Sequence, residues 1–243
     1  MRWLTSREKY FPGVYLLFFI ISLFNLSSAS YASFAQRDTV IAKPKMVVLI
    51  HGLMRTSTSM FFLKYYLKKQ GYEVYSYNYP SAKRTLDEHS LQLNHFLHQL
   101  IAQHPTQPLY LVTHSMGGII ARKALANLPE KQMKYIGGLI MLAPPNQGSS
   151  LAQFTLSIIP GLPYFIKPLP ELSTQNKNYL HQLPVPKIKI GIIAGRYDAK
   201  VPPHSAYLEG QQPPVVVNST HTFIMNNAEV KRLITRFIEK GTF

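Results

Sequence analysis

The sequence predicts an α/β protein with a mostly parallel central sheet flanked by helices. Several short runs, such as residues 46–50 and 108–113, are apolar on both faces, which is typical of strands buried between two layers of helices. Segments of helix length separate these runs, as expected when helices cover both sides of a parallel sheet. One proline-rich stretch, residues 149–184, breaks this alternation. We interpret it as a cap or lid inserted into a single domain.

Each expected element follows from its local pattern. Strands are expected where β-branched and apolar residues cluster, and helices where apolar residues recur every three or four positions or where a strand is followed by a segment of helix length. Gly71 closes the first helix and Pro80 ends the second strand. The expected order is strand 46–50, helix 57–70, strand 72–79, helix 85–103, strand 108–113, helix 117–127, strands 135–142, 188–194 and 215–217, and helix 228–239.

Composition excludes several classes of function. The chain has no cysteine, so it has no disulfide scaffold, thiolate zinc site or cysteine nucleophile. Its 26 Lys and Arg against 11 Asp and Glu give a net charge of +15, which favours anionic partners such as a membrane surface, or simply a solvated basic protein. No compact block of Lys and Arg is interleaved with aromatic residues, so nucleic acid is not an expected partner.

The N-terminal segment has the order of a secretory signal peptide. Three cations precede the apolar run of residues 13–24, and small and polar residues follow it, with cleavage expected after Ala32 or Ala35. We therefore expect residues 1–35 to be removed and residues 36–243 to form the mature domain, periplasmic or secreted. The alternative is an uncleaved segment that anchors the protein to the membrane.

A candidate nucleophile lies in the stretch THSMGG, residues 113–118. Ser115 falls between an expected strand and an expected helix, where a sharp turn exposes the serine hydroxyl above the sheet and near the helix N-terminus. The turn brings together the positions two before and two after the serine, so both are usually small. Gly117 fits this pattern, whereas Thr113 stands where the G-x-S-x-G motif has its first glycine.

The acid and the base are found by elimination. In proteins built around such a serine turn, the acid and the histidine follow the serine in that order. Asp198 is the only aspartate after Ser115, and only His204 and His221 come later. His221 follows the last expected strand and is preferred as the base, with Asp198 orienting it, whereas His204 lies only six residues after the acid in a proline-flanked turn.

A site for acyl transfer also needs donors for the oxyanion. The backbone N–H of Met116, directly after the serine, is one candidate. The other is the N–H of Leu53 in the loop after the first strand, where Gly52 allows the backbone to turn inward. His51, Gly52 and His114 adjoin this place and are expected to contact the substrate.

Four segments together resemble the α/β-hydrolase superfamily, in particular small bacterial serine lipases and esterases. They are VVLIHGL (47–53), THSMGG (113–118), LAPPNQGS (142–149) and NSTHTFIM (218–225). The similarity spans residues 45–240. It implies the α/β-hydrolase fold, a serine acyl hydrolase with Ser115, Asp198 and His221 at the catalytic positions, backbone donors at Leu53 and Met116, and no cofactor.

We therefore expect a hydrolase of carboxylic esters with an apolar acyl part, small-molecule or lipid. The alternatives are an acyltransferase or thioesterase on the same fold, and a hydrolase-like protein that binds lipid or a partner without turnover. The apolar residues 154–172 are expected to form an acyl-chain pocket or lid, or an ordinary cap. No metal site is expected, because the four histidines of the stretch 89–104 lack carboxylates at ligand spacing and are interpreted as exposed.

Overall fold

The computed structural model describes residues 43–159, 161–173 and 177–243. The expected signal peptide, residues 1–35, and the alternative membrane anchor lie outside these residues. In the described part of the chain, no helix is both long enough and apolar enough to span a membrane.

The centre of the domain is a six-stranded sheet in which all paired strands are parallel, in the order β2-β1-β3-β4-β5-β6. The predicted parallel α/β architecture is therefore confirmed. The strands are β1 (Met46–Ile50), β2 (Glu73–Tyr77), β3 (Leu109–His114), β4 (Ile136–Leu142), β5 (Ile190–Gly195) and β6 (Val215–Val217). All five residues of β1 are buried, as expected for a strand covered on both faces.

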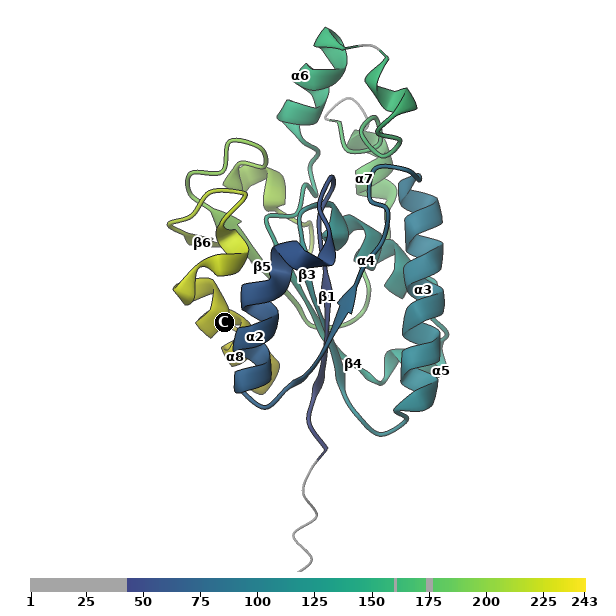
Figure 1. Ribbon diagram of the computed structural model, residues 1–243, viewed down its shortest axis with the longest axis vertical. Coiled ribbons are helices and arrows are strands. Elements are labelled where there is room, and N and C mark those ends of the chain that lie inside the picture. Colours follow the sequence, from purple (N-terminus) through teal and green to yellow (C-terminus); the bar gives the residue numbers. More distant parts are fainter. Residues whose placement is uncertain (1–42, 160, 174–176) are drawn as a thin grey trace, which may run out of the picture. The chain divides into compact units, whose positions relative to one another are not determined.

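Helices cover both faces of this sheet (Figure 1). The helix α2 (Phe61–Lys69) and the helix α8 (Ala228–Lys240) pack on one face, and α3 (Leu86–Gln103) and α4 (Met116–Ala126) pack on the other. The shorter elements are η1 (Ser57–Met60), α5 (Glu130–Met133), α6 (Ser150–Ile158), η2 (Leu162–Tyr164), α7 (Lys177–Gln182), η4 (Pro203–Ala206) and η5 (Ile224–Asn226).

The predicted helix at residues 57–70 has a tighter first turn than expected. It begins as the 3-10 helix η1 and continues as α2, and Gly71 follows with a φ of +88°. A glycine in this left-handed region is a common way to end a helix. The predicted helix 85–103 begins with a capping box, in which Thr85 and Glu88 satisfy each other's backbone N–H groups.

The strand order changes direction between β1 and β3, and this is where an open parallel sheet forms a crevice. The chain goes from β1 outward to β2 and then returns to the other side of β1 for β3. Ile50 at the end of β1 pairs with Thr113 near the end of β3. The loop that starts at His51 and the turn at Ser115 therefore meet at the same edge of the sheet.

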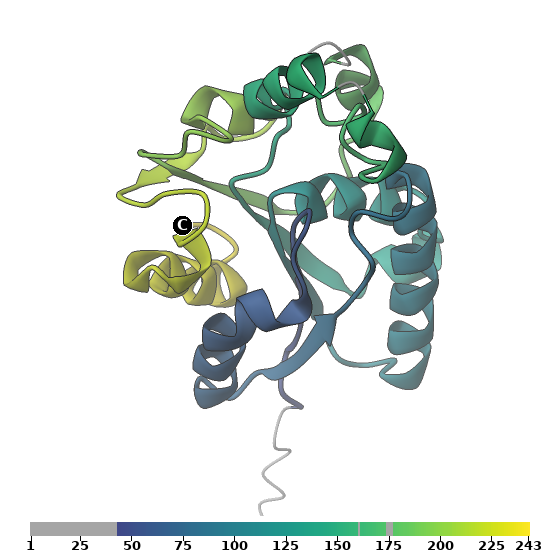
Figure 2. The ribbon, with the colours of Figure 1, turned by 45° about the horizontal axis from the view of Figure 1, so that its top comes forward.

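The insertion, residues 149–184, leaves the sheet between β4 and β5 and carries α6, η2 and α7, seen beyond the strand ends in Figure 2. Ser149 caps α6 by accepting the N–H of Ala152. Ile166, Leu169 and Leu172 of the insertion are buried in the core cluster on the α3 and α4 side of the sheet. The insertion is therefore packed onto the domain.

One expectation about the histidines of α3 is wrong. His95 and His98 are exposed as expected, but His104 is half-buried and His89 is completely buried. His89 lies on the core side of α3, where its ring stands edge-on to Tyr79 with the ring centres 4.8 Å apart. Helical spacing places position 89 on the same face as Leu93 and Leu97, so the apolar face of the helix includes this histidine.

Candidate active site

Ser115 stands on a strained turn between β3 and α4. Its φ of 53° and ψ of −126° are unfavourable for a residue with a Cβ, and such strain costs on the order of 1–3 kcal/mol and occurs mainly at functional sites. The turn is held from both sides, because the Ser115 N–H donates to Leu142 O at 2.8 Å and the Gly118 N–H donates to Ser115 O at 2.9 Å. Met116 is the first residue of α4, so its N–H has no carbonyl partner within the helix.

The neighbours of the serine explain how this turn tolerates Thr113. A Cβ on Gly117 would lie 2.7 Å from His51 O, so only glycine fits against the end of β1. Thr113 is buried and its hydroxyl donates to Ile140 O at 3.3 Å. A Cβ on Gly118 would lie 3.2 Å from this hydroxyl and 2.7 Å from the end of the Met141 side chain. Gly118 thus leaves the space that the threonine side chain needs.

The structure brings Ser115, His221 and Asp198 into one hydrogen-bonded chain. His221 Nε2 lies 3.0 Å from Ser115 Oγ, and His221 Nδ1 lies 2.7 Å from Asp198 Oδ2. Asp198 follows β5 and His221 follows β6, so each residue comes from the carboxyl end of a different strand. Asp198 is 4% exposed and His221 8% exposed, which keeps bulk water from competing for these hydrogen bonds.

The Asp198 carboxylate is fixed by its own loop. Its Oδ1 accepts the backbone N–H groups of Lys200 and Val201 at 2.9 and 2.8 Å, which leaves Oδ2 for His221. A carboxylate with both oxygens engaged in this way is oriented before any substrate binds. Asp198 can therefore hold the His221 ring with Nε2 toward Ser115.

His114 packs against His221 and forms a hydrogen bond to its backbone. Its Nε2 donates to the backbone carbonyl of His221 at 3.0 Å, and the centres of the two rings lie 4.8 Å apart. Burial is the main cause that holds the pKa of His114 well below its usual value, and the positive charges of Arg55 and Lys200 lower it further, as does any proton on the neighbouring His221. His114 is therefore neutral at physiological pH and acts as a hydrogen-bond donor.

The loop after β1 is held against Ser115 by aromatic packing. The His51 ring stacks on Tyr79 with ring centres 4.2 Å apart, and the Tyr79 hydroxyl donates to His51 O at 2.6 Å. A Cβ on Gly52 would lie 3.1 Å from Ser115 Cβ, so the loop backbone runs directly beside the serine. This brings Leu53 to the edge of the cavity that Ser115 also lines.

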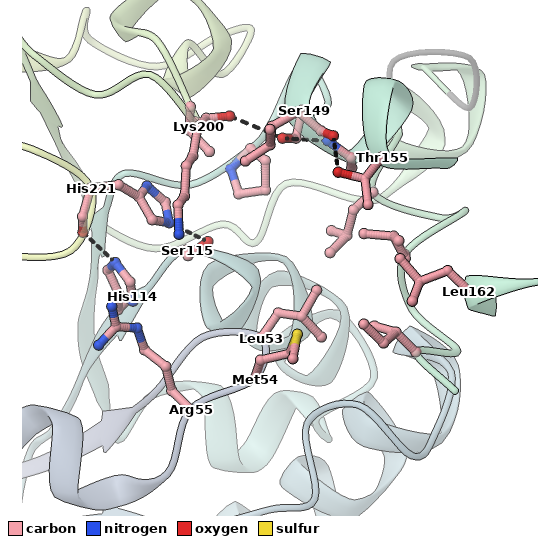
Figure 3. A pocket seen from close by; sticks show the side chains of 17 residues that line it. Leu53, Met54, Arg55, His114, Ser115, Ser149, Thr155, Leu162, Lys200 and His221 are labelled. Atoms are coloured by element: carbon pink, nitrogen blue, oxygen red, sulfur yellow. Dashed lines mark hydrogen bonds between the residues drawn. The ribbon is translucent and has the colours of Figure 1, made fainter. Parts of the chain in front are cut away.

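A cavity of about 410 Å³ opens above Ser115 (Figure 3). Its walls come from the loops after β1, β3, β4, β5 and β6 and from the insertion. The lining residues are Leu53, Met54, Arg55, His114, Ser115, Pro145, Ser149, Leu151, Ala152, Thr155, Leu162, Ile166, Leu169, Leu172, Lys200, Val201 and His221. Most of them are apolar, which suits an apolar ligand with a few polar groups at one end.

Not every predicted contact residue reaches this cavity. His114 lines it, but His51 and Gly52 do not, because His51 is buried behind the loop against Tyr79. His204, the weaker candidate for the base, is exposed in η4 and does not line the cavity. Within the described residues, no group of three or more potential ligand side chains could hold a metal ion.

Sequence reasoning missed two cations that line the cavity: Lys200, which reaches toward Ser115, and Arg55, which lies beside His114 (Figure 3). Arg55 comes two residues after Leu53, and Lys200 two residues after Asp198. Their short distance in sequence from two expected site residues could have indicated that they lie near the site.

Comparisons with known proteins agree with this fold. The family described as serine aminopeptidase, S33, matches residues 42–183. No curated protein is significantly similar to the sequence.

Solved structures of similar fold include several hydrolases. The mature form of the lipase BlEst2 from Bacillus licheniformis is 20% identical, with a TM-score of 0.64 over 85% of this chain and 95% of that one. A metagenomic carboxyl esterase, MGS0156, is 16% identical with a TM-score of 0.64 over 83% of this chain and 77% of that one. The phospholipase PlaB from Legionella pneumophila is 24% identical with a TM-score of 0.53, over 63% of this chain and 38% of that one. At these identities the likeness concerns the fold.

Proposed function

Because this chain belongs to the serine aminopeptidase S33 family of α/β-hydrolases, we propose that it hydrolyses carboxylic esters with an apolar acyl group through a covalent acyl-enzyme. The observation that carries the proposal is the hydrogen-bonded chain from Ser115 through His221 to Asp198, at distances of 3.0 and 2.7 Å, at the end of a largely apolar cavity. A serine next to a base that is itself oriented by an acid is the arrangement of an activated nucleophile.

In the first half of the reaction, His221 Nε2 takes the proton of Ser115 Oγ while this oxygen attacks the ester carbonyl carbon. The N–H groups of Leu53 and Met116 are the proposed donors to the resulting oxyanion, each worth about 2.7–4 kcal/mol in comparable sites. Asp198 stabilises the His221 imidazolium. The imidazolium then gives its proton to the leaving alcohol, and the acyl group stays on Ser115.

In the second half, His221 takes a proton from a water molecule that attacks the acyl-enzyme. The carbonyl–Oγ bond breaks, the proton returns to Ser115 Oγ, and the carboxylic acid leaves. If an alcohol or thiol replaced water, the same site would transfer the acyl group. Hydrolysis and transfer therefore differ only in the acceptor.

The lining of the cavity favours an ester over an aminopeptidase substrate. An aminopeptidase must hold a positively charged substrate amino group, and a carboxylate is the usual partner for such a group. None of the cavity-lining residues in the described part of the chain is Asp or Glu, and two are cations, Arg55 and Lys200. These charges would repel a substrate ammonium group.

The proposal is tested with nitrophenyl esters of two to twelve carbons in the acyl chain. We expect the purified protein to cleave them and Ser115→Ala to lower kcat by at least about 10⁴-fold. Ser76→Ala, a matched change on the edge strand β2 away from the cavity, is expected to keep full activity. A folded wild-type protein that cleaves none of these esters, or that cleaves only aminoacyl nitroanilides, would overturn the proposal.

A further inference from the structure

Two positively charged side chains line the cavity, Lys200 reaching toward Ser115 and Arg55 lying beside His114 (Figure 3). Arg55 extends from the loop after β1 and Lys200 from the loop after β5, and both lie at the end of the cavity where Ser115 and His221 lie (Figure 3). The two loops also carry Leu53 and Asp198. The cations are therefore attached to the same backbone segments as the proposed catalytic groups.

Among the described residues, neither cation has a partner of opposite charge. The ion pairs among residues 43–159, 161–173 and 177–243 are Lys45–Glu239, Lys123–Asp87 and His221–Asp198, and no carboxylate of these residues lines the cavity. The described part of the cavity lining thus contains two basic side chains and no acidic one.

These charges bear on the proposed chemistry. Both act on the buried His114, whose pKa they lower in addition to the larger effect of burial. His114 is in contact with His221, the group that must become positive when it takes the serine proton.

The opposite wall of the cavity has a different character. Leu162, Ile166, Leu169 and Leu172 come from the insertion and form an apolar lining away from Ser115, as the position of Leu162 in Figure 3 illustrates. An ester carbonyl at Ser115 would therefore have an apolar environment on one side and a cationic one on the other.

We propose, building on the esterase function above, that the substrate is an amphiphilic ester whose acyl chain occupies the insertion side and whose alcohol carries a phosphate between Arg55 and Lys200. A guanidinium group matches the oxygens of a phosphate in two-point contact, and an ammonium group adds a compact charge. Monoacyl glycerophosphates are the simplest esters of this class. The net charge of +15 would also raise the rate at which such anions reach the site.

The first test is a comparison of two soluble esters with the same ten-carbon acyl chain, decanoylglycerol phosphate and decanoylglycerol, below their micelle concentrations. We expect kcat/KM to be at least about tenfold higher for the phosphate ester, and Arg55→Gln and Lys200→Gln each to lower it by about tenfold. The ratio of kcat/KM for the phosphate ester to kcat/KM for decanoylglycerol is expected to fall about tenfold in each variant. Lys167→Gln removes the same charge from an exposed lysine that does not line the cavity, and is expected to change neither ester.

A second test separates this inference from the esterase proposal because it needs no turnover. Binding to Ser115→Ala is measured by calorimetry with decanoylglycerol phosphate, decanoylglycerol and glycerol 3-phosphate. Binding of the acylated phosphate about tenfold tighter than either fragment, and its loss in Ser115→Ala/Arg55→Gln, supports the inference. Equal affinity for the charged and neutral lipids overturns it, and so does glycerol 3-phosphate binding as tightly as the acylated compound. If Lys167→Gln weakened the binding of the acylated phosphate equally, the effect would come from the net charge of the protein. This result would also overturn the inference.

Discussion

The two ends of the cavity are built in different ways. At the sheet end, Ser115, Asp198 and His221 extend from the carboxyl ends of three parallel strands and are joined by hydrogen bonds. At the insertion end, apolar side chains line the cavity while neighbouring ones face outward, with Tyr164 84% and Phe165 72% exposed. A rigid sheet suits chemistry that depends on fractions of an ångström, whereas apolar contacts suit recognition that depends on size and area.

The largest effect is expected from a substitution at the sheet end of the cavity, at Asp198. In Asp198→Asn, the side-chain oxygen can keep the N–H bonds of Lys200 and Val201, so the amide nitrogen is turned toward His221. Two donors then face each other, His221 adopts the wrong tautomer, and kcat is expected to fall about 10⁴-fold with little change in KM.

This result is checked by steady-state kinetics on a nitrophenyl ester, together with thermal melting. Asp87→Asn is the matched control, because Asp87 is bonded to Lys123 and Tyr179 on the surface and does not reach the cavity. A loss of less than tenfold in Asp198→Asn would mean that Asp198 does not orient the base.

A smaller effect is expected at the insertion end. Ala152 of α6 lines the cavity and is 6% exposed, so Ala152→Phe would fill space that we assign to the acyl chain. We expect kcat/KM for a twelve-carbon nitrophenyl ester to fall about 10–100-fold, and that for the acetyl ester to change less than threefold.

Ile158→Phe serves as the control, since Ile158 lies on the same helix, is 60% exposed and does not line the cavity. If Ala152→Phe reduced the activity on all chain lengths equally, the insertion end would not hold the acyl chain. Catalysis and selectivity for acyl-chain length would then not belong to different ends of the cavity.

The smallest effect is expected in the pH dependence of the free energy of unfolding, to which three buried histidines contribute. Burial lowers the pKa values of His51, His89 and His114, so below about pH 6.5 the unfolded chain gains protons that the folded protein does not. The contribution of these histidines to the free energy of unfolding should therefore be fully present above pH 6.5 and decrease as the pH falls below this value. The decrease is at most about 1.4 kcal/mol per pH unit for each such histidine.

Urea unfolding at pH 8.0, 6.5 and 5.0 measures this slope. His89→Phe is expected to reduce the slope, by at most about 1.4 kcal/mol per pH unit. His95→Phe, at an exposed position of the same helix, is expected to leave the slope unchanged. Identical slopes for the wild type and His89→Phe would show that His89 is not held neutral by the fold.

Much of the site could be predicted because its signals are local. Ser115, Asp198 and His221 each follow a short apolar run, and parallel strands bring their carboxyl ends to one edge of the sheet. The prediction that these residues lie together needed only their order along the chain and the strand positions. The position of His51 behind its loop was not predictable, because it depends on Tyr79, 28 residues later.

The sequence by itself thus determined the parallel α/β architecture, the strand ends and the order of the three proposed catalytic residues, because apolar runs and turn residues act over a few positions. Only the tertiary structure decided which side chains share the cavity. Arg55, Lys200 and the apolar residues of the insertion come from segments far apart in the chain and meet above Ser115. Their meeting depends on how the loops and the insertion pack, and packing between distant segments leaves no periodic trace in the sequence.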